Sequence, residues 1–162
     1  MVKTNHKLSV KFSYNDKIIE KSGDARIYRD AILLTPGAWS DSLAGAPVEY
    51  TPSELKKSAG KWTSNYLNLD HNWSVLSRIG YVENTHWNKG VRGDLHIHPI
   101  TQNAKDTITM IDAGFVNHLS VELMSEDIWK AEDEKRYATN IEFIGLGVVL
   151  HPACPDSRII PD

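Results

Sequence analysis

Two short segments of this chain carry residues that could perform hydrolytic chemistry. Residues 67–71 end in His71, and residues 115–123 contain Ser120. A serine hydroxyl is a weak nucleophile until a neighbouring base accepts its proton, and histidine is the most common base. Both segments are rich in apolar residues and predict buried strands, which can bring distant residues together. Ser120 and His71 are therefore a candidate nucleophile and general base.

The predicted strand around Ser120 carries polar side chains on one face. His118, Ser120 and Glu122 alternate with apolar residues, so a period of two directs all of them to the same side. This face is either exposed to solvent or lines a site. Taken alone, Ser120 fits a serine whose hydroxyl binds the backbone, and His71 fits a surface or core histidine. The two residues point to catalysis only if they are neighbours.

A catalytic histidine needs a third group, which holds the imidazole in one tautomer and stabilises its charged form. Glu142 lies in a strand pattern in which Ile141 and Phe143 share one face and Glu142 points to the other. If that other face is exposed, Glu142 is only a surface charge. The candidates for the third group are Glu142, His151, His118, Asp70 and Glu122.

Two further patterns are interpreted as structural. His96 and His98 share one face of a predicted strand, a spacing that metal sites use, but no cysteine or carboxylate cluster lies nearby in the sequence. A solvated strand face is the better interpretation, and no metal or cofactor is expected. The single Cys154 excludes an intrachain disulfide and fits a reducing compartment.

Length and composition predict one soluble globular domain over residues 1–162, with a net charge of −3, 41% hydrophobic residues and 24% charged residues. The charge gives no nucleic-acid footprint, and the longest apolar run, residues 143–150, is too short to cross a bilayer. No apolar segment follows the basic first residues, so a cleaved secretory signal is not expected.

The hydrophobic pattern predicts a mainly β protein with helices, of the α+β class. Thr51, Pro52 and Glu54 form a helix start for a helix reaching Lys61, and Gly114 caps a second helix. The architecture is most simply a small barrel or sandwich with two or three helices outside. The predicted elements are strands over residues 8–14, 25–34, 67–71, 79–82, 95–98, 115–123 and 137–150, helices over 52–61 and 101–113, and a loop or hairpin tip over 126–135.

Taken in order, roughly residues 39–160 resemble the prohead proteases of tailed phages and archaeal tailed viruses, which are related to the herpesvirus assemblins. The chain has a helix before the histidine and a helix rich in Thr and Ala before the serine. The segments that carry the resemblance are Asn68-Leu69-Asp70-His71, Ile79-Gly80-Tyr81-Val82, Gly93-Asp94-Leu95, Gly114-Phe115-Val116-x-x-Leu119-Ser120 and Gly147-Val148-Val149-Leu150-His151-Pro152-Ala153-Cys154-Pro155.

The resemblance implies a small closed β-barrel surrounded by two or three helices, like the herpesvirus proteases. It implies that Ser120 is the nucleophile and His71 the general base of a serine endopeptidase. Such an enzyme cleaves scaffold and major capsid proteins, and itself, inside the assembling prohead in the host cytoplasm. It needs no cofactor, and a homodimer is possible. Neither nucleic acid nor a membrane is an expected partner.

This chain departs from the family pattern at two positions. Many phage members carry Ser-x-Gly where this chain has Ser120-Val121-Glu122, and many carry a glutamate where it has Gly145. The third residue of assemblins is a histidine some tens of residues after the serine, a range that includes Glu142 and His151. Glu142 is preferred, because a carboxylate orients an imidazolium better than a second imidazole does.

Other details stay open at this point. Backbone N–H groups, or an arginine such as Arg136 or Arg158, could stabilise the oxyanion. Two other functions are alternatives to catalysis by Ser120. One is a non-catalytic module that binds scaffold or capsid on the same fold, and the other is a metal-dependent hydrolase that uses His96 and His98.

Overall fold

The computed structural model describes residues 24–40 and 46–160. The strand predicted over residues 8–14 lies outside them. Most of the other predicted elements are present, and β5 and β6 are longer than predicted. In chain order the elements are β1 (Arg26–Leu34), β2 (Gly37–Trp39), β3 (Val48–Tyr50), α2 (Pro52–Ser58), β4 (Trp62–Leu69), the 3₁₀ turn η1 (Val75–Ser77), β5 (Arg78–Trp87), β6 (Val91–Ile97), α3 (Gln102–Asp112), β7 (His118–Lys130) and β8 (Lys135–Val149).

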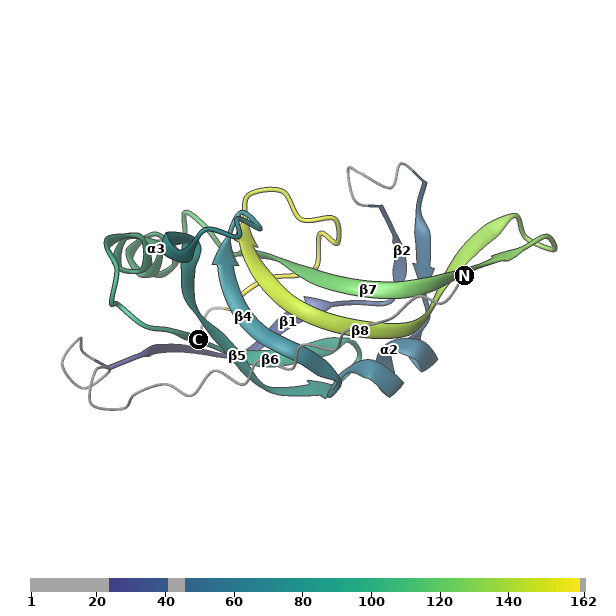
Figure 1. Cartoon of the computed structure of the whole chain (residues 1–162), viewed down its shortest axis with the longest axis horizontal. Helices are drawn as coiled ribbons and strands as arrows, with labels where there is room; N and C mark the ends of the chain where they lie inside the picture. The colour runs from purple at the N-terminus through teal and green to yellow at the C-terminus, as the bar shows by residue number, and fades with distance from the viewer. Residues whose placement is uncertain (1–23, 41–45, 161–162) are drawn as a thin grey trace, which may run out of the picture.

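The described strands form one curled, eight-stranded sheet (Figure 1). Its order is β1-β6-β5-β4-β8-β3-β2, and β7 pairs with β8. β8 is the central strand, because it runs antiparallel to β7 along one edge and parallel to β4 and β3 along the other. The last residues of β8 are buried, as expected for a strand with neighbours on both sides. Side chains from β4 and from β7 can therefore approach each other across β8.

A short C-terminal segment, residues 157–159, lies between the edges of β1 and β7. Arg158 and Ile32 exchange two backbone hydrogen bonds of 2.8 and 3.0 Å. On the other side, the N–H of Leu119 donates to the carbonyl of Ser157 at 3.0 Å, and the N–H of Ile159 donates to the carbonyl of Asn117 at 2.8 Å. The sheet is therefore curled so far that one short segment hydrogen-bonds to both β1 and β7. These two strands are not paired with each other.

The helices α2 and α3 begin where their capping residues predict. The hydroxyl of Thr51 accepts a hydrogen bond from the N–H of Glu54 at 3.4 Å, and Thr101 does the same for Ala104 at 3.2 Å. α3 ends at Asp112, followed by Gly114 with φ 77°, as predicted. α2 ends at Ser58, before the predicted Lys61, because β4 begins directly afterwards.

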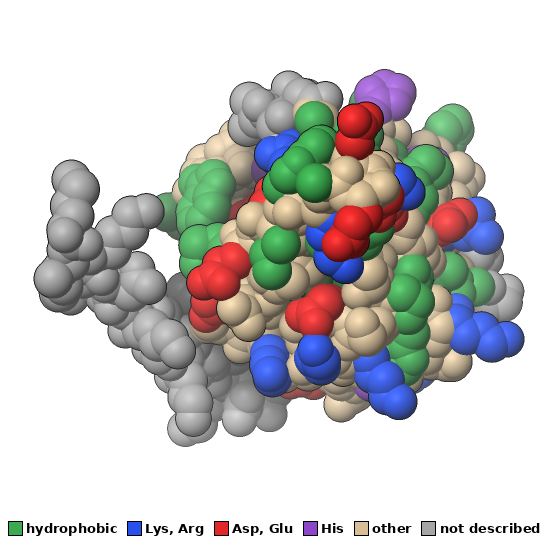
Figure 2. Space-filling model, turned by 90° about the vertical axis from the view of Figure 1, so that its right-hand side faces the viewer, with side chains coloured by type: hydrophobic (Ala, Val, Ile, Leu, Met, Phe, Trp, Pro, Cys, Tyr) green, Lys and Arg blue, Asp and Glu red, His purple; other side chains and the backbone are tan. Residues whose placement is uncertain are grey.

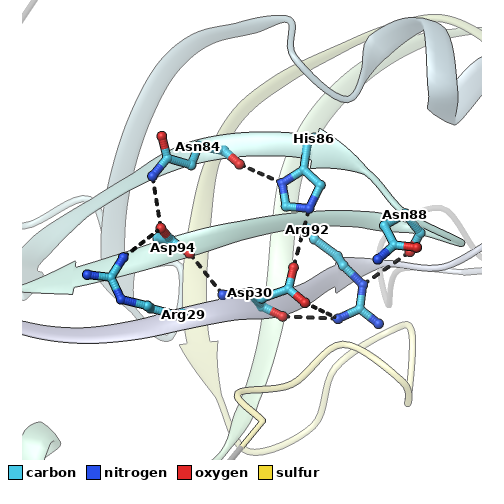
Figure 3. Close-up of polar contacts among 7 residues, drawn as sticks. All are labelled: Arg29, Asp30, Asn84, His86, Asn88, Arg92 and Asp94. Carbon is cyan, nitrogen blue, oxygen red and sulfur yellow. Dashed lines mark hydrogen bonds and ion pairs between the residues drawn. The ribbon is translucent and has the colours of Figure 1, made fainter.

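β6 lies between two bulged strands, and one carboxylate of β6 fastens both bulges (Figure 3). Asp30 in β1 and Asn84 in β5 have positive φ values of 50° and 51° at the register shifts. Asp94 of β6 accepts hydrogen bonds from the N–H of Asp30 and from the side-chain amide of Asn84, both at 2.9 Å. The guanidinium of Arg29 adds a contact of 3.4 Å to the same carboxylate. Asp94 is buried, so these bonds replace its lost hydration.

Charged side chains of both signs are interspersed with apolar ones on the face that lies at the right of Figure 1 (Figure 2). No helix in the described part of the chain has the length and apolar character that a membrane span requires.

Candidate active site

Two glycines of β8 leave space between the side chains of β4 and β7, the strands on either side of it. Gly145 lies between Tyr66 of β4 and Glu122 of β7, and Gly147 lies between Asn68 and Ser120. A Cβ atom on Gly145 would come within 2.2 Å of the Tyr66 ring, and one on Gly147 would lie 3.0 Å from the His71 ring. Side chains from β4 and β7 can therefore meet across β8 only because β8 has no side chains at these positions.

His71 is held in a tight turn at the end of β4. Asp70 and His71 have positive φ values of 48° and 54°, and the N–H of Asn72 donates to the carbonyl of Leu69 at 2.8 Å. Positive φ at both central residues is the pattern of a type I′ turn. The N–H of Asp70 also donates to the carbonyl of Val148 at 3.0 Å, which ties the turn to β8. The turn folds the imidazole back over Gly147.

Glu122 receives hydrogen bonds at both carboxylate oxygens. Its Oε1 atom lies 2.8 Å from Nδ1 of His71, and its Oε2 atom accepts a short hydrogen bond from the hydroxyl of Tyr66. Because an ionised carboxylate can only accept, Nδ1 of His71 carries the hydrogen. Nε2 is then the ring nitrogen that can accept a proton from another group.

The electrostatics of this cluster favour an ionised Glu122. Burial alone would raise the pKa of its carboxyl, but the hydrogen bonds from His71 and Tyr66 and the charges of His71 and Arg78 hold that pKa below its usual value. Burial and the hydrogen bond to Glu122 raise the pKa of the Tyr66 hydroxyl, so this group stays protonated and donates. The guanidinium carbon of Arg78 lies 4.5 Å from the centre of the Tyr66 ring and steadies it from the other side.

Ser120 lies on the same face of β7 as Glu122, and both line a pocket of about 480 Å³ together with His71. The pocket runs along the outer edge of β7, where its far wall comes from β1, β2, β3 and residues 153–157. The structure thus brings together the predicted Ser120 and His71, and adds Glu122 from among the alternatives for the third group.

The structure does not bring Glu142 to His71. Glu142 is half-buried in a second pocket, which it lines with Glu54 and Lys57 of α2. Ile141 and Phe143 do point into the core as predicted, and Glu142 points away from it. Glu122, one of the other candidates for the third group, is instead the carboxylate in hydrogen-bond contact with the imidazole.

The other sequence candidates lie elsewhere. Asp70 and His151 are exposed, and His118 does not line the pocket. Arg136 binds the carbonyl of Ala46 at 2.9 Å, and the backbone of Arg158 joins β1 to β7, so neither lines the pocket.

His96 and His98 both stack on the ring of Tyr81, at centroid distances of 4.7 and 5.5 Å. Among the described residues, no group of three or more His, Cys, Asp or Glu side chains is arranged to hold a metal ion. Cys154 is buried and lines the same pocket as Ser120.

The sequence contains a pattern that favours Glu122, but the pattern is visible only when two strands are compared. It shares its strand face with Ser120, and the central strand has glycine at both positions that a side chain would need to cross. The pairing of Ser120–Val121–Glu122 with Gly145–Leu146–Gly147 becomes informative only when β8 is known to lie between β4 and β7.

Comparison with known proteins shows similarity to a protein family and to a solved structure. The family model described as "Caudovirus prohead serine protease" matches residues 14–161. Among solved structures, the capsid assembly protease gp21 of bacteriophage T4 is similar with a TM-score of 0.51 at 12% sequence identity, over 80% of this chain and 98% of that one. At this identity the likeness concerns the fold alone. No curated protein matches the chain.

Proposed function

Because the chain belongs to the caudovirus prohead serine protease family, we propose that it is a serine endopeptidase in which Ser120, His71 and Glu122 act together. The observation that carries this proposal is the hydrogen bond of 2.8 Å between Glu122 and Nδ1 of His71, in a pocket that Ser120 also lines. A nucleophile, a base and a group that orients the base are the three parts such chemistry needs.

In the proposed mechanism, Oγ of Ser120 attacks the scissile carbonyl carbon while Nε2 of His71 accepts the hydroxyl proton. The imidazolium that forms is stabilised by Glu122, whose carboxylate stays fixed by the hydroxyl of Tyr66. His71 then gives the proton to the leaving amine, and the acyl group remains on Ser120. A water molecule, activated by the same imidazole, releases the acyl group and restores the serine.

The open edge of β7 is the proposed docking line for the substrate main chain. The N–H of Leu119 points away from β8, because it donates to Ser157. Val121 lies two residues further along without a register shift, so its N–H and C=O point the same way, toward the pocket. Within the described part of the chain, only β8 pairs with β7 as a strand. An extended substrate could therefore add to β7 beside Ser120.

The proposed substrates are scaffold and major capsid proteins, and the enzyme itself, inside an assembling prohead in the host cytoplasm. Family membership supports this proposal, and so does the likeness in fold to a phage capsid assembly protease. A closed barrel of the herpesvirus-protease type and a homodimer also stay proposals. The curled sheet, whose edges residues 157–159 span, is compatible with such a barrel.

Incubating the purified chain with an unfolded protein substrate tests the function. Mass mapping of new N-termini should find cleavage by the parent and only background cleavage by Ser120→Ala. Equal cleavage by both proteins would contradict the proposal. Binding to scaffold or capsid protein without cleavage would favour a non-catalytic binding module instead.

A further inference from the structure

The pocket beside Ser120 has a predominantly apolar wall opposite the catalytic side chains. This wall comes from the facing strands β1, β2 and β3 and from the C-terminal loop, and β7 and β8 add Leu123 and Ile144 at its border. Leu34, Val48 and Cys154 are buried, whereas Trp39, Leu123 and Ile144 are partly exposed to the pocket. The apolar side chains used in this argument are Leu34, Trp39, Val48, Leu123, Ile144 and Cys154.

The polar groups of Trp39, Ser157 and Cys154 in this wall are already bound within the chain. Nε1 of Trp39 donates to the carbonyl of Thr35 at 2.8 Å. The hydroxyl of Ser157 donates to the carbonyl of Leu33 at 2.7 Å. The sulfur of Cys154 and the hydroxyl of Thr35 lie 3.3 Å apart and bind each other. These groups shape the wall, but they leave little hydrogen-bonding capacity for a polar ligand.

The charges of the pocket are confined to its catalytic side. Among the described residues that line it, the acidic and basic side chains are His71 and Glu122. They bind each other, and Tyr66 occupies the second oxygen of Glu122. A charged or amide side chain placed against the far wall would lose its hydration without gaining a partner, whereas an apolar one would gain from burial.

We propose that this wall is an apolar subsite, which selects a leucine, isoleucine, valine or methionine side chain at a position flanking the scissile bond. The inference rests on the proposed function, because it takes Ser120 as the nucleophile. At about 480 Å³, the pocket has room for such a side chain together with the adjoining substrate main chain.

A peptide library that varies every position around the scissile bond tests this inference. For the parent, kcat/KM at one flanking position should be at least about tenfold higher with an aliphatic residue than with aspartate, lysine or asparagine. A preference for a charged or amide residue at every flanking position, or no preference at any, would overturn the subsite.

The variant Ile144→Glu tests whether the apolar wall causes the substrate preference. Ile144 is partly exposed and lines the pocket, so the substitution places a carboxylate there at a low risk to folding. The aliphatic preference should fall at least about tenfold, and lysine should become acceptable at the same position. Ile128→Glu is the matched control, because Ile128 is exposed on β7 and does not line the pocket. An unchanged preference in a folded Ile144→Glu variant would overturn the inference.

Labelling of Ser120 with a fluorophosphonate distinguishes failure of the subsite from failure of the proposed serine protease activity. Labelling and cleavage without aliphatic selectivity would reject the subsite and leave the serine protease standing. Absence of both labelling and cleavage by the folded parent would reject the serine protease, and the subsite with it.

Discussion

At the scale of single residues, the account depends on the carboxylate of Glu122, which accepts from His71 at one oxygen and from Tyr66 at the other. An amide cannot replace it, because a neutral amide does not stabilise the imidazolium that forms during the reaction. Tyr66 can accept as well as donate, so the NH₂ group of the amide is also free to face Nδ1, which would favour the wrong tautomer of His71.

We therefore expect Glu122→Gln to lower kcat by about 10³–10⁴-fold, the scale of losing the carboxylate in a serine–histidine–aspartate arrangement. Cleavage of a peptide substrate under single-turnover conditions would measure it. Glu142→Gln is the matched control and should keep parental activity, because Glu142 lies in the other pocket. If Glu142→Gln were the inactive variant, the assignment of Glu122 would fail.

The buried imidazole of His98 makes stability depend on pH. Burial, with a smaller contribution from the charge of His96, lowers the pKa of His98 in the folded chain below the ordinary 6.5. The unfolded chain therefore binds the proton more readily, and the folded state loses stability as the pH falls through the ordinary histidine pKa. Tyr81 stacks on both rings, and Glu83 lies 3.5 Å from His96.

Thermal unfolding between about pH 7 and about pH 5.5 tests this prediction, because most carboxyl groups titrate below that window. The Tm of the parent should fall more steeply than that of His98→Gln. His151→Gln, at an exposed position, should follow the parent. Parallel curves for the parent and His98→Gln would show that His98 does not contribute.

At the scale of elements, β8 makes room for the candidate site because Gly145 and Gly147 have no side chains. A methyl group on Gly147 would lie 3.0 Å from the imidazole of His71, closer than an ordinary contact, so the ring must shift by a few tenths of an ångström. Gly147→Ala should lower kcat by about 10–100-fold with a smaller effect on KM, because misplacement of a catalytic group is costly even over short distances.

Gly60→Ala is the control for this substitution, since the nearest atom to its added methyl lies 3.9 Å away. It should keep both activity and stability. Parental kcat in Gly147→Ala would mean that the position of His71 over β8 is not the catalytic one.

The bulges of β1 and β5 depend on Asp94, which binds the N–H of Asp30 and the amide of Asn84. Asp94→Ala removes the acceptor, so the N–H of Asp30 and the amide of Asn84 lose their hydrogen-bond partner at partly buried positions. The free energy of unfolding should fall by about 1–3 kcal/mol, measured by denaturant titration. Asp106→Ala, on the exposed surface of α3, is the control and should change stability little. An equal loss in both variants would contradict the role of Asp94.

Local patterns predicted those elements whose periodicity is set by burial. β1, β5, β6 and β8 were predicted as extended apolar segments, β4 in part from the alternation over residues 67–71, and α2 and α3 from their caps. β2 and β3 were missed, because strands of three residues show no periodicity. β7 runs on to Lys130, beyond its predicted end, because exposed and charged residues there are held by pairing with β8 rather than by burial.

At the scale of the whole molecule, the candidate site depends on strand order, which no single segment contains. The sequence pointed to Ser120 and His71 separately, and a period of two placed Glu122 beside Ser120. The choice of Glu142 followed the spacing of related enzymes along the chain. Glu122 reaches His71 instead because β8 lies between β4 and β7 and carries Gly145 and Gly147 where the side chains cross.

The curled sheet also positions the pocket, because its far wall comes from strands distant in sequence order from β7. Leu34 of β1 and Trp39 of β2 face Ser120 across the pocket, and residues 157–159 join the edges of β1 and β7. The strands that carry or adjoin the proposed nucleophile, base and subsite therefore belong to one curved sheet (Figure 1).

The central claim is that His71 and Glu122 activate Ser120. Labelling with a fluorophosphonate, followed by mass mapping of the adduct, tests it most directly, with parent, His71→Ala, Glu122→Gln and Glu142→Gln compared side by side. The account predicts an adduct on Ser120 in the parent and in Glu142→Gln, formed far more slowly in the other two. An adduct on a different residue, or one on Ser120 that forms equally fast without His71, would contradict it.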